Sequence, residues 1–256
     1  AAALHLARAI DQATTAPHVG VMLPTSGLFP AALVAGWMLG RTVVPINYLL
    51  SSAEIEYILD DAAVDTVVTV GPLVRMVGGL PERVRQIRMD EMSFRGMPPL
   101  RRPHHRDDSF LAVLLYTSGT SGRPKGVELT AANLQANVSQ CVRWAEFTRR
   151  DVMLGVLPQF HSFGLTVLTI IPLAVGCRAI YTARFVPARI LELLRVHRPT
   201  VFVAIPSMYN ALRSAKSARP DDFASLRYIV SGAEPLPDAV AEAFRVRFGV
   251  TINEGY

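Results

Sequence analysis

Half of the 256 residues are hydrophobic and the mean hydropathy is +0.29, so the chain can bury a sizeable core in one large or two small domains. The formal net charge of +5 is interpreted first as an arginine-rich solvated surface, and alternatively as a field that favours anionic ligands such as ATP, a phosphopantetheine carrier or an anionic membrane surface. The arginines do not alternate with aromatic residues, and no nucleic-acid partner is expected. Cys141 and Cys177 are too few and too far apart for a disulfide framework or a cysteine metal site. They favour a reducing, cytoplasmic setting.

Strand-like and helix-like segments alternate along the first part of the chain. Strands are expected at 19–23, 42–45 and 66–70, and helices at 28–39 and from a cap at 51–52 to about 61. This alternation predicts a parallel sheet covered by helices. Residues 90–108 are rich in Pro, Arg, His and Asp and are interpreted as a connecting segment. A first α/β subdomain is therefore expected over residues 1–107.

A second α/β part is expected over residues 108–256. It begins with an apolar strand at 110–115, followed by a helix over 131–144 that Thr130 could cap. The longest apolar run, 163–177, contains Pro172 and Gly176, is too short to span a membrane, and predicts a buried helix. The remaining predicted elements, in chain order, are a helix at 187–197, a strand at 200–204, a helix at 206–214, a strand at 226–230 and a helix at 237–248 that ends at Gly249.

Residues 116–127 read Tyr-Thr-Ser-Gly-Thr-Ser-Gly-Arg-Pro-Lys-Gly-Val and follow the predicted strand at 110–115. Backbone N–H groups, hydroxyl groups and one lysine can converge there on phosphate oxygens, and glycine permits the close approach. The chain has 24 Arg but only two Lys, and a compact ammonium group at Lys125 suits a polyphosphate that moves. Pro124 breaks the Walker A spacing and Arg123 breaks the GxSxG nucleophile pattern. A Ser/Gly linker is the alternative, and the ordered ending in Pro-Lys-Gly disfavours it.

This loop resembles the signature loop of the adenylate-forming, acyl-activating enzymes. Segments 158–164, 231–236 and 253–256 resemble three further motifs of that family, and they occur in the family's order. Segments 160–166 and 222–228 are most similar to fatty-acid-activating members. Among these, they look most like the acyl-acyl-carrier-protein synthetase domain that is sometimes fused to a lysophospholipid acyltransferase.

The resemblance implies roles for individual residues. Those implied to hold the β- and γ-phosphates of ATP are Thr117, Ser118, Gly119, Thr120, Ser121, Gly122 and Lys125. Those implied to meet adenine are Gly232, Ala233 and Glu234 along the backbone, then Glu254, Gly255 and Tyr256, whose ring would stack on the base. Those implied to form the acyl site are His161, Phe163, Gly164, Pro206 and Ser207. Lys125 and His161 are the implied catalytic residues. His161 could instead be an ordinary core histidine, and the glycine turn at 232 an ordinary strand-to-helix turn.

The implied reaction is ATP-dependent activation of a carboxylic acid, with a fatty acid preferred, through an acyl-adenylate to a thioester of CoA or acyl carrier protein. Such chemistry needs charge stabilisation and alignment rather than a protein nucleophile. The implied fold is the N-terminal core of an acyl-activating enzyme, truncated at both ends, with the small C-terminal domain absent. The ligands of Mg²⁺ are then expected outside this chain, and the chain alone is expected to be inactive. Membrane association could arise through a fused region. The alternative function is a non-catalytic nucleotide- or acyl-binding module.

Overall fold

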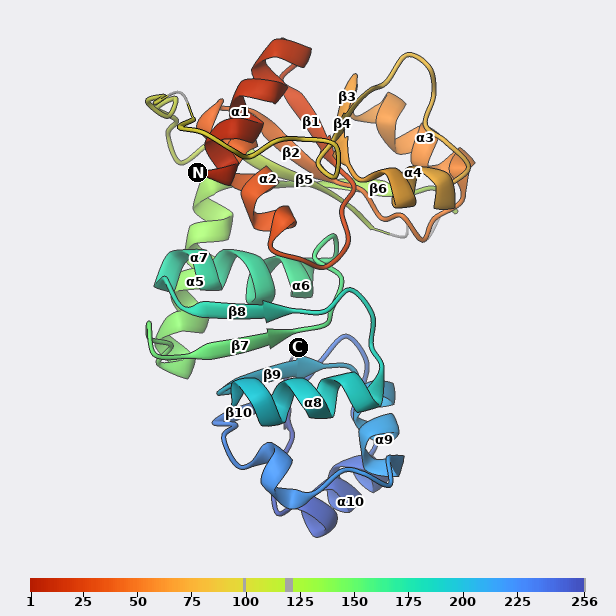
Figure 1. Ribbon diagram of the computed structural model, residues 1–256, viewed down its shortest axis with the longest axis vertical. Coiled ribbons are helices and arrows are strands. Elements are labelled where there is room, and N and C mark those ends of the chain that lie inside the picture. Colours follow the sequence, from red (N-terminus) through yellow and green to blue (C-terminus); the bar gives the residue numbers. More distant parts are fainter. Residues whose placement is uncertain (99, 118–121, 256) are drawn as a thin grey trace. The chain divides into compact units, whose positions relative to one another are not determined.

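The computed structural model describes residues 1–98, 100–117 and 122–255, and the chain divides into two compact units (Figure 1). The first unit comprises Ala1–Gln140 with Gln159–Ser162, and the second comprises Cys141–Pro158 with Phe163–Tyr256. Each unit contains one sheet with flanking helices. The predicted α/β architecture with two sheet-containing parts is therefore confirmed.

The first unit is built on a six-stranded sheet in the order β4-β3-β1-β2-β5-β6. Neighbouring strands are parallel, except that β5 and β6 are antiparallel. Its strands are β1 (His18–Val21), β2 (Thr42–Pro45), β3 (Thr66–Thr69), β4 (Arg85–Arg88), β5 (Leu111–Thr117) and β6 (Lys125–Thr130). Its helices are α1 (Ala2–Ala13), α2 (Leu28–Met38), α3 (Ser52–Asp61) and α4 (Gly71–Met76), and α5 (Ala131–Ala145) continues into the second unit.

Local sequence signals explain several of these elements. The strands β2 and β3 are short β-branched runs that are buried along their whole length, as expected for a parallel sheet covered on both faces. Helix α3 begins at the predicted place, because Ser51 and Glu54 form a capping box in which each side chain accepts a hydrogen bond from the other's backbone N–H. Trp37 on α2 donates its indole N–H to the carbonyl of Ala112 on β5 at 2.9 Å.

The expected boundary between residues 107 and 108 is not where the compact units divide. Strand β5 pairs with β2 through Val43 and Val113, and β6 pairs with β5, so both strands extend the first sheet. The Pro- and Arg-rich segment before them is a connection within the first unit. An apolar run predicts a buried strand, but it does not indicate which sheet the strand joins, because that depends on pairing with distant residues.

The second unit is built on a five-stranded parallel sheet in the order β11-β10-β9-β7-β8. Its strands are β7 (Val152–Gly155), β8 (Arg178–Tyr181), β9 (Val201–Ala204), β10 (Tyr228–Ser231) and β11 (Asn253–Glu254). Its helical segments are α6 (Ser162–Leu165), η1 (Thr166–Ile170), α7 (Ile171–Val175), α8 (Pro187–His197), α9 (Pro206–Ser214), η2 (Pro220–Phe223) and α10 (Asp238–Phe248). The predicted helices at 187–197 and 206–214 are confirmed, and Gly249 ends α10 with φ of +70°.

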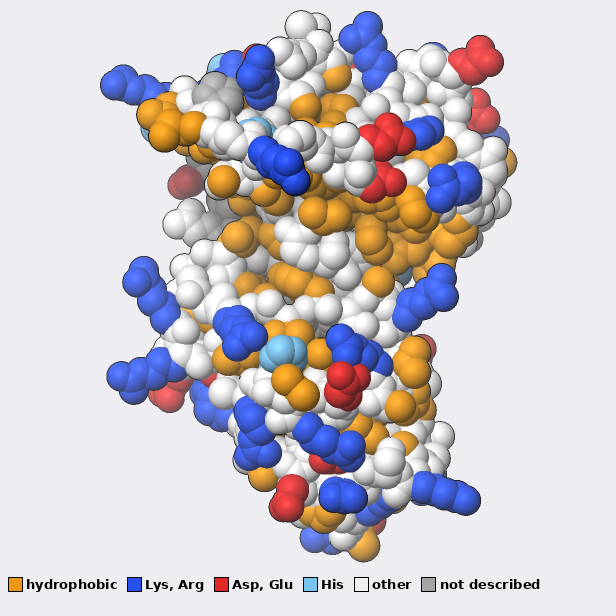
Figure 2. Space-filling model, viewed as in Figure 1, with side chains coloured by type: hydrophobic (Ala, Val, Ile, Leu, Met, Phe, Trp, Pro, Cys, Tyr) orange, Lys and Arg blue, Asp and Glu red, His pale blue; other side chains and the backbone are white. Residues whose placement is uncertain are grey.

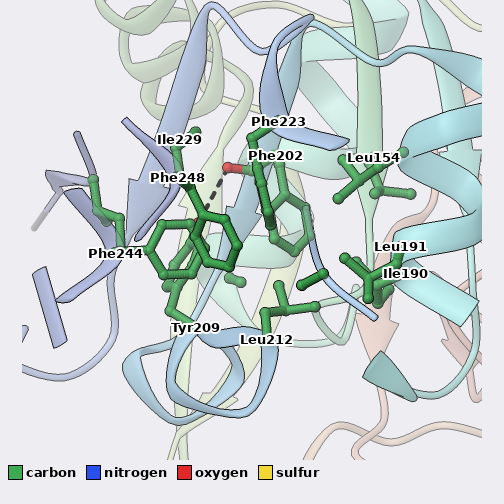
Figure 3. Packing of buried hydrophobic residues seen from close by; sticks show 14 of the residues in the cluster. Leu154, Ile190, Leu191, Phe202, Tyr209, Leu212, Phe223, Ile229, Phe244 and Phe248 are labelled. Atoms are coloured by element: carbon green, nitrogen blue, oxygen red, sulfur yellow. Dashed lines mark hydrogen bonds between the residues drawn. The ribbon is translucent and has the colours of Figure 1, made fainter. Parts of the chain in front are cut away.

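The core of the second unit lies between one face of its sheet and the helices α8, α9 and α10. Leu154, Phe202 and Ile229 occupy one row across three strands, because Leu154 is in register with Phe202 and Phe202 with Ile229 (Figure 3). Tyr209 on α9 is fully buried among them and donates its hydroxyl to the carbonyl of Val230 at 2.7 Å. The remaining aromatic rings of this core come from η2 and α10: Phe223, Phe244 and Phe248.

A buried carboxylate joins the starts of three strands in this unit. Asp151, 4 % exposed, accepts hydrogen bonds from the N–H of Thr148, the hydroxyl of Thr200 and the guanidinium of Arg227. Burial by itself would raise the pKa of Asp151. These donors outweigh burial and hold that pKa below its usual value. The carboxylate therefore stays ionised and holds the segments before β7, β9 and β10 together.

The apolar run at 163–177 is helical, as expected, but it is not a regular α-helix. It consists of α6, one π-helical turn over Thr166–Ile170 and α7, and it ends at Gly176 with φ of +73°. Tyr181 on β8 donates its hydroxyl to the carbonyl of Leu168 in the π-turn at 2.6 Å. Within the described part of the chain, no helix is long and apolar enough to cross a membrane.

Candidate functional site

The predicted phosphate loop is the connection of a β-hairpin. Strand β5 ends at Thr117 and β6 begins at Lys125, and these two residues are directly paired across the antiparallel ladder. Opposite residues in such a pair project from the same face of a sheet, and both side chains are exposed. The side chains of Thr117 and Lys125 therefore start side by side at the base of the loop. Ser118, Gly119, Thr120 and Ser121 lie outside the described residues.

The described end of the loop leaves its backbone accessible. Gly122 has φ of +83°, a conformation that glycine adopts without strain. No heavy atom of the described residues lies within 4 Å of the position that a Cβ at Gly122 would occupy. An open backbone beside a hydroxyl and an ammonium group fits an anionic ligand such as a polyphosphate.

Helix α3 contacts the hairpin on both sides of the loop. The sequence analysis did not predict these contacts. Tyr116 on β5 donates its hydroxyl to the carboxylate of Asp61. Burial, together with this carboxylate, raises the pKa of Tyr116 well above its usual value. On the other side of the loop, the guanidinium of Arg123 lies 5.7 Å from the centre of the Tyr57 ring. One face of α3 therefore contacts the residues that flank the phosphate loop.

His161 belongs to the first unit and lies beside the buried ring of Phe160, which contacts the half-buried Tyr48. The ring of Phe160 is 4.7 Å from that of His161 and 4.9 Å from that of Tyr48, measured between centroids. His161 keeps part of its surface in solvent, and desolvation of the remainder lowers its pKa. The imidazole is thus neutral at pH 7. The preceding Gln159, which the sequence analysis did not select, accepts a hydrogen bond from the N–H of Ser26 at 2.9 Å.

The predicted adenine turn follows β10 in the second unit, at the carboxyl end of the parallel strands. The N–H of Gly232 donates to the carbonyl of Ala204 at the end of β9, and the N–H of Gly255 donates to the carbonyl of Ser231 at 2.7 Å. Pro206 and Ser207 open helix α9 directly after β9. In open parallel sheets, ligands bind outside the carboxyl ends of the strands, so these segments lie where a binding site is expected.

Close packing at Gly232 explains why this position has no side chain. A Cβ there would lie 2.7 Å from Cε1 of Phe163 and 3.0 Å from the carbonyl oxygen of Gly255. The structure thus brings together three of the predicted site residues within one unit. The Phe163 ring, predicted for the acyl site, rests on the glycine predicted for the adenine turn. The next residue, Gly164, is buried in α6.

The other predicted residues of the turn, Ala233, Glu234 and Glu254, are exposed. Ala233 has φ of +70°, an uncommon conformation for a residue with a side chain, which often marks a functional turn. Glu234 is exposed, whereas Glu254 accepts a hydrogen bond from the N–H of Leu236 at 2.9 Å and so supports the turn from β11. The hydroxyl of Ser231 is buried, with no hydrogen-bond partner among the described residues. Tyr256, predicted to stack on adenine, lies outside the described residues.

The described side chains fit phosphate better than a metal ion. Lys125 and Thr117 supply a cation and a hydroxyl group, whereas no three His, Cys, Asp or Glu residues gather into a metal-binding group anywhere in the described ranges. The individual roles assigned to the site residues stay predictions.

Comparison with known proteins identifies the family. Residues 1–256 match the family model of the AMP-binding enzymes, and the chain belongs to this family. It is 34% identical to a long-chain-fatty-acid–CoA ligase of Bacillus subtilis over 148 residues, which is 57% of this chain and 26% of that protein. It is 29% identical to the human mitochondrial malonate–CoA ligase over 273 residues, covering 93% of this chain and 45% of that protein.

Solved structures confirm the fold. The ATP-bound crystal structure of MatB from Rhodopseudomonas palustris matches 99% of this chain with a TM-score of 0.83 and 26% identity, and 52% of that chain is covered. In this match and in that to the malonate–CoA ligase, the chain spans about half the length of the related protein. The resemblance to adenylate-forming enzymes is confirmed for both family and architecture.

Proposed function

We propose that this protein activates a carboxylic acid with ATP, forms an acyl-adenylate, and transfers the acyl group to the thiol of CoA. The observation that carries the proposal is the pairing of Thr117 with Lys125 at the base of a phosphate-type loop, in a chain that matches the AMP-binding family throughout. The names of the two relatives, both acid–CoA ligases, support the reaction class.

The chain's own residues account for part of this chemistry. Negative charge on the β- and γ-phosphates grows as the acid attacks the α-phosphorus and pyrophosphate leaves. Lys125 is positioned to neutralise that charge, and the hydroxyl of Thr117 donates a hydrogen bond beside it. Mg²⁺, when bound, would neutralise further phosphate charge through ligands outside the described residues. Neutral His161 does not pair with the substrate carboxylate as an ion, so its role is to orient that group through a hydrogen bond.

A fatty acid is the substrate class that we propose. The predicted acyl motif is rich in aromatic and apolar residues, Phe160 and Phe163 among them, and an apolar chain would gain from burial against such residues. Malonate, the acid named for the human relative, carries a second carboxylate that would need a cationic partner. Acyl carrier protein is a second possible acceptor of the acyl group, as the sequence resemblance suggested, and the assay below distinguishes it from CoA.

The test is ATP–pyrophosphate exchange on the full-length protein with octanoate, palmitate and malonate in turn. Exchange with the fatty acids that is much faster than with malonate supports the substrate class, and thioester formation with CoA or with acyl carrier protein identifies the acceptor. Lys125→Ala should lower the exchange rate about 100-fold. Lys216→Ala is the matched control, because Lys216 is the chain's second lysine and is exposed after α9.

Two outcomes would contradict the proposal. Absence of exchange with every acid, despite measurable ATP binding, would favour the non-catalytic nucleotide- or acyl-binding module. Equal losses in the Lys125 and Lys216 variants would show that Lys125 does not serve the phosphates.

A further inference from the structure

The excess positive charge of the chain is confined to the second unit. That unit has 14 Lys and Arg residues against 9 Asp and Glu, a formal charge of +5. The first unit has 12 of each and is neutral. The net positive charge of the chain therefore comes from the second unit alone.

Several of these charges lie at the edge of the second sheet where its parallel strands begin. Val152 on β7 is in register with Arg178 on β8, and Val201 on β9 is in register with Tyr228 on β10, so the strand starts are aligned. Figure 2 shows Lys and Arg side chains projecting from the side on which β7 and β8 begin. We call this the amino edge. Its exposed arginines that have no acidic partner in the described ranges are Arg149, Arg150, Arg178 and Arg198.

The buried acids nearby are already occupied by other arginines. Asp151 pairs with Arg227, and Asp222 pairs with Arg195. In the described ranges, none of the four amino-edge arginines has a carboxylate within salt-bridge distance. Arg178 instead lies 3.4 Å from the ring of His197, and Arg198 donates to the carbonyl of Asp221. Glu146 and Asp221 are the exposed acids of this region.

Exposed apolar side chains accompany these arginines. Trp144, at the end of α5, is 72% exposed and stacks on Tyr228, which Arg227 covers from 4.6 Å. Val196, 66% exposed, is in the last turn of α8, just before Arg198. Basic residues at helix C-termini are favoured by the helix dipole. The helix dipole can thus account for Arg198 at the end of α8. It does not account for Arg149 and Arg150, which lie beyond the end of α5.

We propose that the amino edge docks on a membrane surface rich in anionic phospholipids. These arginines lie at the starts of three neighbouring strands, β9, β7 and β8, whose spacing of about 4.8 Å spreads the positive charge over roughly 10 Å, which is wider than one phosphate group and suits an array of headgroups. Arginine pairs with phosphate through two parallel hydrogen bonds, and an exposed tryptophan is favoured at the membrane–water interface. The predicted nucleotide turn lies at the opposite, carboxyl end of the strands, so docking leaves it accessible. This proposal does not depend on the proposed reaction.

The test is sedimentation of the protein with vesicles of equal parts phosphatidylcholine and phosphatidylserine, with pure phosphatidylcholine vesicles for comparison. Binding to the anionic vesicles alone, weakened by added salt, is expected. Insertion of Trp144 should shift the tryptophan emission to shorter wavelength, and Trp144→Phe should abolish that shift. The second tryptophan, Trp37, is already bonded to the carbonyl of Ala112 and should not respond.

Charge variants test the location. Arg149→Gln combined with Arg150→Gln should lower the vesicle partition coefficient about 30-fold while far-UV circular dichroism stays unchanged. The matched control removes the same charge elsewhere: Arg189→Gln with Arg245→Gln, two exposed residues paired with glutamates on α8 and α10. An equal loss in the control would overturn the location. Absence of vesicle binding would overturn the proposal, and if the protein then bound polyglutamate through the same arginines, an acidic protein would be the partner.

Discussion

Replacing Gly232 with alanine should destabilise the second unit by forcing the Phe163 ring away. The added Cβ would lie 2.7 Å and 2.9 Å from two ring carbons of Phe163, closer than carbon atoms pack, and 3.0 Å from the carbonyl oxygen of Gly255. Overpacking of this kind costs about 1–3 kcal/mol. The ring is half-buried and can shift, but the backbone carbonyl cannot move easily, so a loss of about 2 kcal/mol is expected.

Thermal unfolding of the chain measures this loss. For a chain of this size, about 2 kcal/mol lowers the Tm by roughly 4–8 °C. Phe163→Ala should itself cost about 1–2 kcal/mol, because a half-buried ring is removed. The double variant should be more stable than the sum of the two losses predicts, by about 1 kcal/mol, since no ring remains to clash with the new methyl group.

The control is Gly27→Ala, at a glycine with φ of −67° and no described heavy atom within 4 Å of the new Cβ. It should change the stability by less than about 1 kcal/mol. The reasoning fails if Gly232→Ala is as harmless as this control. It also fails if the losses in the double variant simply add, because Phe163 would then not be the residue that excludes a side chain at position 232.

Three further changes test the packing of the second unit. Asp151→Ala should cost about 2–3 kcal/mol in urea unfolding, because Arg227 and Thr200 lose their acceptor. The folded state lowers the pKa of Asp151. The stability that its carboxylate supplies should therefore be complete above pH ~4 and disappear as the pH falls through that lowered pKa. The Asp151→Asn variant should not show this decline. Gly249→Ala should cost about 1 kcal/mol in the same assay, because φ of +70° strains alanine. Tyr209→Phe should cost about 1 kcal/mol by removing the hydrogen bond to Val230.

Elements that depend on local signals could be predicted from the sequence. The capping residues Ser51 and Thr130 marked the starts of α3 and α5, and Gly249 marked the end of α10. The predicted bounds of α8 and α9 agree with the structure, and both helices begin with proline at the first helical position. These signals act over a few residues, because they concern backbone groups that have no partner within the helix.

For the candidate site, the sequence predicted the motifs but not the contacts that support them. The resemblance of four motifs, in the family's order, was enough to identify the family, although the turn at 232 and His161 would each be ambiguous in isolation. The contacts that support the motifs were not apparent: Tyr116 with Asp61, Arg123 with Tyr57, and Phe160 with Tyr48. Such partners are distant in the sequence, and nothing in the local pattern identifies them.

The sequence by itself therefore determined the class of fold, the family and the residues that line up along its motifs. The tertiary structure decided which sheet β5 and β6 join, that Thr117 and Lys125 are paired across a hairpin, and that the Phe163 ring rests on Gly232. The physical reason is the range of the interactions. Helix caps and turn conformations are set by neighbouring residues, whereas strand pairing and side-chain packing join residues that only the folded chain brings together.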